Sequence, residues 1–210
     1  METYENNPVK EPENEKPKRK PASKGSTFLL YLHDIIYLLA VVMVLLLVFF
    51  RIVVVSGSSM KNTLVDGDYL LLLSNVFYRN PEQGDIVVIS KDSFDNGAPI
   101  VKRVIATEGQ FVRFEGGKVY VGDSPELEKM QLLDEPYISS PTLNQQGIVE
   151  VQKGCIFVMG DNRSGSKDSR DPVIGQIDKR EILGKVILLM LPGTDKGQQP
   201  PDYSRIGAVS

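Results

Sequence analysis

Residues 99–106 read Pro-Ile-Val-Lys-Arg-Val-Ile-Ala, an apolar run with two adjacent charges at its centre. With the period of two that is typical of a β-strand, Lys102 falls among the apolar residues of one face and Arg103 among those of the other. The run therefore predicts a strand that carries one charged side chain in the middle of each apolar face.

Similar short apolar runs lie on both sides of this strand, at residues 68–74, 85–90, 110–115, 118–123, 155–160 and 185–191. Runs with a period of two, separated by Gly, Asn and Asp, indicate antiparallel sheets. Glu115-Gly116-Gly117-Lys118 joins two of them as a hairpin, because paired glycines supply the positive φ angles of tight turns. Residues 124–152 are less regular and are expected to leave the core. The predicted fold class is mostly β and antiparallel.

The chain before these strands is apolar from Phe28 to Val55. Residues 35–50 carry no charge, and residues 52–55 extend the run past Arg51. About 20 such residues span a bilayer, with Arg51 reaching toward the interface. A cleaved signal peptide is the alternative, but its apolar region has only about 7–15 residues. We therefore expect an uncleaved transmembrane anchor over residues 28–55.

The charges that flank this anchor predict its orientation. Five basic residues crowd its N-terminal flank, at positions 16, 18, 19, 20 and 24, whereas Arg51 stands alone at the other end. The positive-inside rule then places residues 1–27 in the cytoplasm, as a tail whose Pro-, Glu- and Lys-rich composition predicts disorder. Residues 56–192 are then expected to form an extracytoplasmic β domain, and residues 193–210 a loose C-terminal tail. The expected location is the cell membrane, with a single span.

The composition excludes several classes of function. From Ser56 onward the chain has 17 basic and 21 acidic residues, a net charge of −4 that gives it no electrostatic reason to bind nucleic acid. Cys155 is the only cysteine, so an intramolecular disulfide and a cysteine-based zinc site are excluded. The only histidine, His33, lies in the anchor, so a hydrolase in the folded domain needs another base. We expect no metal and no cofactor.

Lys102 is the candidate for that base. The ordinary interpretation is that its ammonium extends past a sheet edge into water, as lysine and arginine side chains often do. The functional interpretation is that apolar neighbours desolvate the ammonium and lower its pKa until a neutral amine exists. A neutral amine can accept the proton of a serine hydroxyl. Arg103 stays charged, so of the two only Lys102 can act as a base.

Two polar stretches could supply the other groups. Ser56-Gly57-Ser58-Ser59 follows the anchor and leads into a strand, so it is either a juxtamembrane turn or a rigidly placed nucleophile. Residues 160–170 read Gly-Asp-Asn-Arg-Ser-Gly-Ser-Lys-Asp-Ser-Arg and could be a surface turn or the support of an active site. A calcium loop does not fit, because Arg163 and Gly165 occupy positions that need oxygen ligands.

Taken in order, four short motifs resemble those of the type I signal peptidases, most closely the single-anchor form of Gram-positive bacteria. They are Ser59-Met60 with Thr63-Leu64, residues 84–88, Lys102-Arg103, and residues 160–163 with 166–170. The resemblance runs from the anchor to about Pro192. Each motif alone is a weak signal, whereas the combination is highly specific.

The resemblance implies a serine endopeptidase with a Ser/Lys dyad, in which Ser59 is the nucleophile and Lys102 the general base. Ser166 would orient the lysine amine, and Asp168 and Arg170 would form an ion pair behind it. The remaining implied site residues are Asp161 and Asn162 as supports, the Ser59 backbone N–H as oxyanion donor, and Met60 as a substrate contact.

The same resemblance implies the substrates and partners. Exported preproteins would be cut after small residues, commonly Ala-x-Ala, through an acyl-enzyme. Membrane lipid would be a second partner, and the secretion translocase is a further candidate. No nucleic acid is expected.

Two positions near Ser59 differ from the family pattern. Asn62 stands where proline is usual, and Gly57 stands where some relatives carry a serine whose hydroxyl helps to hold the oxyanion. The main alternative function is an inactive relative that serves as an assembly subunit for surface proteins. A self-cleaving Ser/Lys regulator would need a cytoplasmic DNA-binding domain, and a structural β domain on a stalk would leave the mid-strand Lys102 unexplained.

Overall fold

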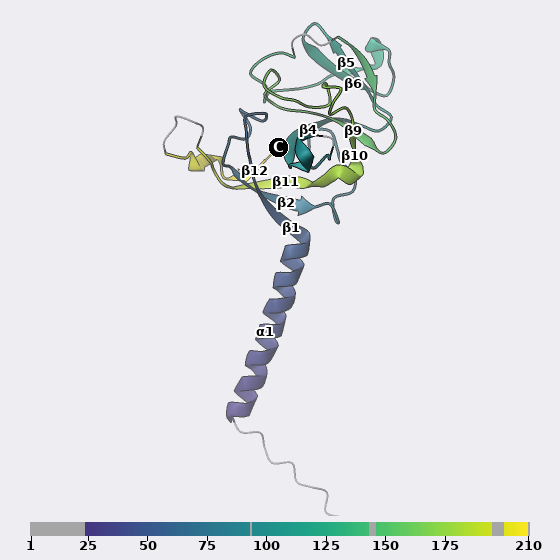
Figure 1. Cartoon of the computed structure of the whole chain (residues 1–210). Helices are drawn as coiled ribbons and strands as arrows, with labels where there is room; N and C mark the ends of the chain where they lie inside the picture. The colour runs from purple at the N-terminus through teal and green to yellow at the C-terminus, as the bar shows by residue number, and fades with distance from the viewer. Residues whose placement is uncertain (1–23, 93, 143–145, 195–199, 210) are drawn as a thin grey trace, which may run out of the picture. The chain divides into compact units, whose positions relative to one another are not determined.

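A computed structural model of the chain describes residues 24–92, 94–142, 146–194 and 200–209 (Figure 1). It contains two compact units, one that ends at Met43 and one that runs from Val44 to the C-terminus. The predicted disordered tail lies almost wholly outside the described residues. Its last residues, from Lys24 on, belong to the first helix.

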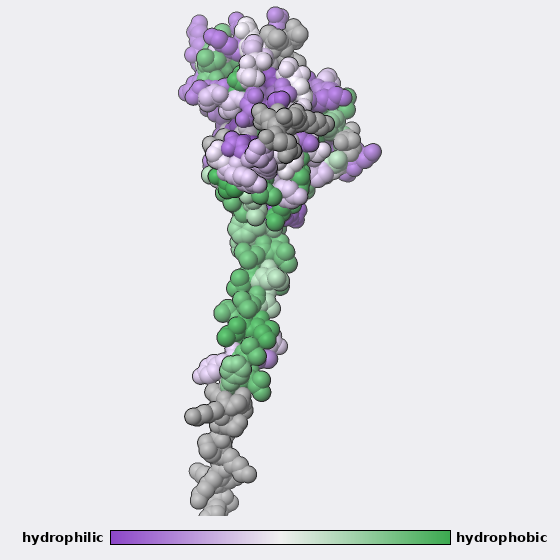
Figure 2. Space-filling model, turned by 90° about the vertical axis from the view of Figure 1, so that its left-hand side faces the viewer, coloured by the Kyte–Doolittle hydropathy of each residue, from purple (hydrophilic) through white to green (hydrophobic). Residues whose placement is uncertain are grey.

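Helix α1 spans Lys24–Phe49, and its segment Phe28–Phe49 is long and apolar enough to cross a membrane. These 22 residues rise about 33 Å as a helix, which matches the hydrocarbon thickness of a bilayer. The face of this helix that Figure 2 shows is hydrophobic along nearly its whole length.

The anchor predicted over 28–55 extends too far at its C-terminal end. The helix stops at Phe49, and strand β1, Phe50–Val54, follows at once and pairs antiparallel with β2, Tyr69–Ser74. Three consecutive β-branched residues, Ile52–Val54, favour a strand, and a partner strand satisfies their backbone groups. Arg51 therefore lies in a strand of the folded unit.

The larger sheet has eight strands in the order β1-β2-β11-β3-β4-β9-β10, and β12 pairs with β11. All paired neighbours are antiparallel. Besides β1 and β2, its strands are β3 (Ile86–Ile89), β4 (Ile100–Thr107), β9 (Cys155–Met159), β10 (Ile177–Asp178), β11 (Ile182–Leu191) and β12 (Gly207–Ala208). The mostly β, antiparallel fold class is confirmed.

The smaller sheet has the order β7-β6-β5-β8. Its strands are β5 (Phe111–Glu115), β6 (Lys118–Gly122), β7 (Gln131–Leu132) and β8 (Gly147–Glu150). The predicted hairpin is confirmed, because Glu115 pairs with Lys118 and both Gly116 and Gly117 have positive φ. Short 3₁₀ helices lie at Asp95–Gly97 (η1), Leu127–Lys129 (η2), Lys179–Glu181 (η3) and Tyr203–Arg205 (η4).

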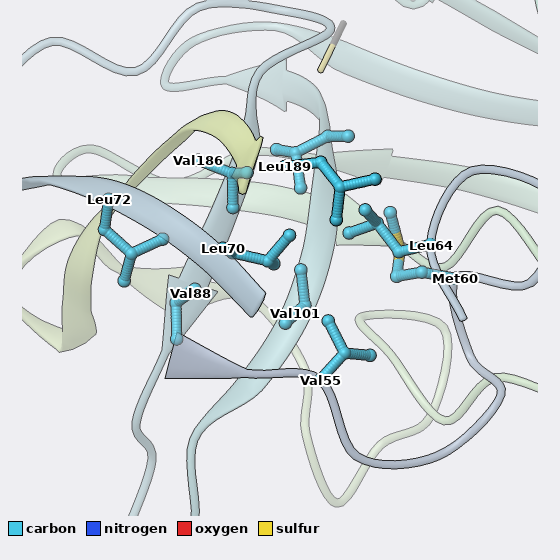
Figure 3. Packing of buried hydrophobic residues seen from close by; sticks show 10 residues of the cluster. Val55, Met60, Leu64, Leu70, Leu72, Val88, Val101, Val186 and Leu189 are labelled. Atoms are coloured by element: carbon cyan, nitrogen blue, oxygen red, sulfur yellow. The ribbon is translucent and has the colours of Figure 1, made fainter. Parts of the chain in front are cut away.

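One of the hydrophobic clusters lies directly beneath the segment between β1 and β2. Met60 and Leu64 of that segment are almost fully buried, and they pack with Val55 and with residues of β2, β4 and β11. Figure 3 shows Met60 and Leu64 side by side, with Val101 of β4 nearby. Burying these side chains fixes the segment onto the sheet.

The C-terminal tail predicted over 193–210 is not loose in its described part. Strand β12 pairs with Leu188 and Leu189 of β11, and Val209 packs against the hydrophobic cluster beneath the β1–β2 segment. Short sequence motifs could not predict this, because two residues of strand carry little periodic signal.

Candidate active site

Ser59 lies in the loop of residues 55–68 that connects β1 with β2. The loop is closed at its base, where Val55 N donates to Asp68 O and Gly67 N donates to Val55 O, both at 2.9 Å. Within it, Lys61 N donates to Ser58 O at 3.1 Å, and Leu64 N donates to Met60 O at 2.9 Å. These turns and the buried Met60 and Leu64 give the Ser59 hydroxyl a fixed place.

Lys102 reaches the same place from β4. Its side chain is 3% exposed, and Nζ donates to Ser59 Oγ at 2.8 Å and to Val101 O at 3.1 Å. Burial lowers the pKa of Lys102 from 10.5 to about 8, because desolvation disfavours the charged form; Asp168 opposes this shift and Arg170 adds to it. A neutral lysine amine is therefore accessible near neutral pH, in contact with a serine hydroxyl.

Asn162 holds the backbone on both sides of the Cα of Ser59. Its backbone N–H donates to Ser59 O and its side-chain amide donates to Ser58 O, both at 3.0 Å. Gly160 lies beside them, and a Cβ at this position would meet Ser59 O and Ser166 Oγ at less than van der Waals distance. Residues 160–162 thus support the serine loop from its side.

A buried ion pair joins Arg103 to the same segment. Arg103 Nε and Nη2 donate to the two carboxylate oxygens of Asp161 at 2.9 and 2.8 Å, and both side chains are at most 3% exposed. Thr63 of the serine loop also donates its hydroxyl to Asp161, at 2.5 Å. Arg103 Nη1 donates to Gly84 O at 2.9 Å. Lys102 of β4 therefore contacts the serine loop directly, whereas Arg103 of β4 is connected to it through Asp161.

Asp168 and Arg170 form a second ion pair behind these groups. Arg170 Nε and Nη2 donate to Asp168 at 2.7 and 2.8 Å, and Asp168 is 1% exposed. The carboxylate also accepts from Gly160 N at 2.9 Å, so it fixes the backbone that carries Asp161 and Asn162. Its charge raises the pKa of Lys102 and so limits the effect of burial.

Three of the predicted site residues do not make the contacts that were expected of them. The Ser166 hydroxyl donates to Lys167 O at 3.4 Å, and no described hydrogen bond joins it to Lys102, although it lies against Gly160. Met60 is 1% exposed in the core, so its side chain supports the loop and is not open to a substrate. Gly57 N donates to Asp66 Oδ1 at 2.8 Å.

The Ser59 N–H is a backbone donor at the nucleophile itself. It makes no hydrogen bond in the described part of the chain, whereas the N–H of Gly57 donates to Asp66. Gly57 has φ +92°, a conformation that a serine would adopt only with strain. The local backbone therefore explains why glycine stands at this position.

Sequence reasoning missed a group of residues in the excursion between β7 and β8. The Tyr137 ring lies under the guanidinium of Arg103, 3.9 Å from its centroid, and Arg163 lies 6.0 Å from the same centroid. Arg163 Nη1 donates to Thr142 Oγ1 at 2.9 Å and Nη2 pairs with Glu135. The signal was weak, because residues 124–152 have no period of two that could indicate a role.

Asn62 ties this excursion to the serine loop. It has φ +95°, and its side-chain amide donates to Tyr137 O at 3.4 Å and to Ser139 Oγ at 3.2 Å. Proline could not adopt this φ angle, since its ring fixes φ near −65°. Asparagine at this position therefore permits a turn with positive φ, and its side chain binds the excursion at Tyr137 and Ser139.

Other features of the folded unit lie apart from Ser59. A cavity of about 490 Å³ is lined by residues that include Gln83, Val104, Lys129 and Tyr137, but neither Ser59 nor Lys102 lines it. Within the described part of the chain, no three His, Cys, Asp or Glu side chains gather as a metal site would require. Cys155 is half-buried at the start of β9.

Comparisons with known proteins agree on one family. The family model described as signal peptidase, peptidase S26, matches residues 29–191. The chain is 34% identical to a probable signal peptidase I-1 of Synechocystis sp. over 151 residues. This aligned region covers 69% of this chain and 72% of that relative. It is 31% identical over 186 residues to signal peptidase I of Bacillus amyloliquefaciens, with 83% and 91% covered. Signal peptidase I U of Bacillus subtilis is 32% identical over 168 residues, with 75% and 84% covered.

Proposed function

The chain belongs to the signal peptidase family, peptidase S26, and on this basis we propose that it cleaves signal peptides from exported preproteins with Ser59 as nucleophile and Lys102 as general base. Family membership implies a peptidase that removes signal peptides, and the apolar helix α1 fits a membrane-anchored protein. We propose, beyond family membership, the two catalytic residues, the acyl-enzyme intermediate and the specificity of cleavage.

The contact of 2.8 Å between Lys102 Nζ and Ser59 Oγ carries this proposal. An exposed lysine stays protonated and can only donate, but a buried lysine with a pKa of about 8 is neutral in about half of the molecules at mildly alkaline pH. The lone pair of the neutral amine then accepts the Ser59 hydroxyl proton across the same contact.

The reaction follows from these two groups. Ser59 Oγ attacks the scissile carbonyl carbon as Lys102 takes its proton, and the Ser59 N–H donates to the oxyanion. The lysine ammonium then gives the proton to the leaving amine, the C–N bond breaks, and an acyl-enzyme remains. A water molecule, deprotonated by the neutral Lys102, hydrolyses the ester and restores the serine. Loss of one oxyanion donor in other enzymes costs about 10²–10³ in rate.

The surrounding residues keep this geometry. Asn162 holds the backbone of Ser58 and Ser59, and Asp161 connects the loop to Arg103. Asp168 and Arg170 fix Gly160 and tune the pKa of Lys102. Ser166, whose hydroxyl lies against Gly160, is proposed to turn toward the lysine amine when substrate displaces its contact with Lys167.

The substrate is proposed to bind as an added strand. Strand β1 is the last in the order of the larger sheet, so its outer edge has backbone groups that an extended peptide could pair with. Such a peptide would place its scissile bond at the end of β1, where the serine loop begins. Small pockets for the −1 and −3 side chains would give the preference for Ala-x-Ala.

The membrane places enzyme and substrate together. The basic residues before α1 predict a cytoplasmic N-terminus, which puts the β domain outside the cytoplasm, where exported preproteins emerge. Preproteins are thus the proposed substrates, membrane lipid the proposed environment and the secretion translocase a proposed neighbour.

The proposal is tested with detergent-solubilised full-length protein and a fluorogenic peptide that contains Ala-x-Ala. Wild type and the exposed-site control Arg180→Ala should cleave it, whereas Ser59→Ala and Lys102→Ala should be folded and inactive. Cleavage by either purified variant would remove that residue from the mechanism. If folded wild type also fails to cleave a full preprotein in lipid, the assembly-subunit alternative is supported.

A further inference from the structure

The C-terminal segment beyond the family match folds back onto the serine loop. The family match ends at residue 191, yet Gly193, Arg205 and strand β12 contact the rest of the folded unit. Strand β12 lies beside β11 (Figure 1), and η4 precedes it with Asp202 as its N-cap, which accepts from Ser204 N at 3.0 Å. This short capped turn presents the side chain of Arg205.

Asp68 is the residue that receives Arg205. It is fully buried at the base of the serine loop, where its backbone carbonyl pairs with Val55. Its carboxylate accepts from Val65 N at 2.8 Å and from Gly193 N at 2.7 Å, so both the loop and the start of the C-terminal segment bind to it. A buried carboxylate needs a cation as well as N–H donors, and Arg205 supplies that charge.

Arg205 binds two places in the loop at once. Nη1 and Nη2 donate to Asp68 at 3.1 and 2.6 Å, and Nη2 also donates to Thr63 O at 3.2 Å. The side chain of Thr63 is already bound to Asp161. Thr63 is therefore fixed through its hydroxyl by the segment after β9 and through its carbonyl by the C-terminal segment.

The path from Thr63 to the nucleophile is short. Thr63 N donates to Met60 O at 3.0 Å, and Met60 directly follows Ser59. A change in the position of Thr63 moves this turn and with it the Ser59 hydroxyl, whose distance to Lys102 Nζ sets the rate of proton transfer. Misplacement of a reacting group by about 1 Å can cost about a hundredfold in rate.

We propose that Arg205 is a positioning residue, and that the C-terminal segment is a clamp that holds the Ser59 loop against Lys102. The inference rests on the proposed function, since it takes Ser59 as the nucleophile. Residues outside the family match thereby acquire a role in the same reaction. The Arg205 guanidinium binds both Thr63 and Asp68 and so fixes the distance between these two residues of the loop.

The experiment compares full-length Arg205→Ala, Arg205→Lys and Arg205→Ala/Asp68→Asn with wild type on the Ala-x-Ala peptide. Arg205→Ala leaves the buried carboxylate of Asp68 without a cation, and the double variant removes that unpaired charge. Comparison of the two variants therefore separates a loss of stability from a loss of loop positioning. Arg180→Ala is the matched control, because Arg180 also forms a bidentate pair with an aspartate, Asp178, but on the exposed surface. Melting curves give the folded fraction, and rates are expressed per folded molecule well below every melting midpoint.

For Arg205→Ala we expect kcat to fall about ten- to hundredfold with little change in KM. Arg205→Lys should recover part of it, because lysine keeps the charge without the fork that spans Thr63 and Asp68. The double variant should melt above Arg205→Ala but below wild type, because asparagine removes the unpaired charge yet keeps only one of the two oxygens that accept from Val65 N and Gly193 N. Its kcat should stay low. A wild-type kcat in the folded double variant would overturn the clamp. Activity in Ser59→Ala, by contrast, would overturn the proposed function itself, so the two failures are distinct.

Discussion

The backbone amide of Asn162 donates a hydrogen bond to the carbonyl oxygen of Ser59 at 3.0 Å. Since the Asn162 side chain also binds Ser58 O, the segment after β9 fixes the peptide unit on each side of the proposed nucleophile. Gly160 allows this close approach, because no side chain fits between it, Ser59 O and Ser166.

Gly160→Ala should therefore lower the cleavage rate by at least about tenfold, since the added methyl group displaces Ser59 or Ser166. Overpacking of this kind costs about 1–3 kcal/mol of stability. Peptide cleavage per folded molecule is the measurement. Gly109→Ala is the control: Gly109 has φ +82° and open space around it, so alanine there adds backbone strain but should leave the rate unchanged. Equal rates in the two variants would contradict the packing argument.

Arg103→Ala should be strongly destabilising. The substitution leaves the buried carboxylate of Asp161 without its bidentate partner, and breaking such pairs costs about 3–5 kcal/mol. Urea unfolding of the folded unit measures the change. The exposed pair of Arg180 and Asp178 provides the comparison, and Arg180→Ala should leave the unfolding midpoint in place. Similar unfolding midpoints for the two variants would show that the buried Arg103–Asp161 pair stabilises the fold no more than the exposed pair does.

Asn62→Pro should impair the enzyme even though it restores the usual residue of the family. The φ angle of +95° at this position is closed to proline, so the turn after Ser59 must rearrange, and we expect a rate loss of at least about tenfold. Asn62→Gly permits the same φ and should keep most of the activity. Steady-state cleavage by both variants checks this, and a more active proline variant would disprove the assigned turn.

Lys102→Met should abolish cleavage and yet raise the melting midpoint at neutral pH. The fall in pKa from 10.5 to about 8 corresponds to about 3 kcal/mol spent on burying the charge. Between these two pH values the unfolded chain binds a proton that the folded chain does not, so the stability of wild type should rise with pH there. In Lys102→Met this rise should be smaller. A methionine variant that melts below wild type at neutral pH would contradict the cost of the buried ammonium.

Periodicity predicted much of the fold but not the position of its ends. The strand over residues 99–106 and the hairpin at Gly116-Gly117 followed from alternation and turn chemistry, both of which act locally. The end of the anchor did not, because Ile52–Val54 are as apolar as a membrane helix and become a strand only through pairing with β2. The packing of the C-terminal segment could not be predicted either, since β12 is only two residues long and Arg205 binds Asp68 and Thr63, which lie more than a hundred positions away.

The candidate site could be predicted only in part for the same reason. A lysine in an apolar strand predicts a lowered pKa, but its contact with Ser59, 43 positions earlier in the chain, depends on how β4 and the serine loop meet. Motifs matched to a family supplied that pairing before the structure did. Tyr137 and Arg205 belong to no motif, and Asn62 departs from one. Their contacts appear only in the structure, where the excursion and the C-terminal segment meet the serine loop.

The central claim is that a neutral Lys102 takes the proton of Ser59, and the dependence of kcat/KM on pH tests it most directly. We expect the rate to rise with pH and to reach half of its maximum near the Lys102 pKa of about 8, because only the deprotonated amine can act as a base. A rate that stays constant from neutral to alkaline pH, with the enzyme folded throughout, would contradict a lysine base.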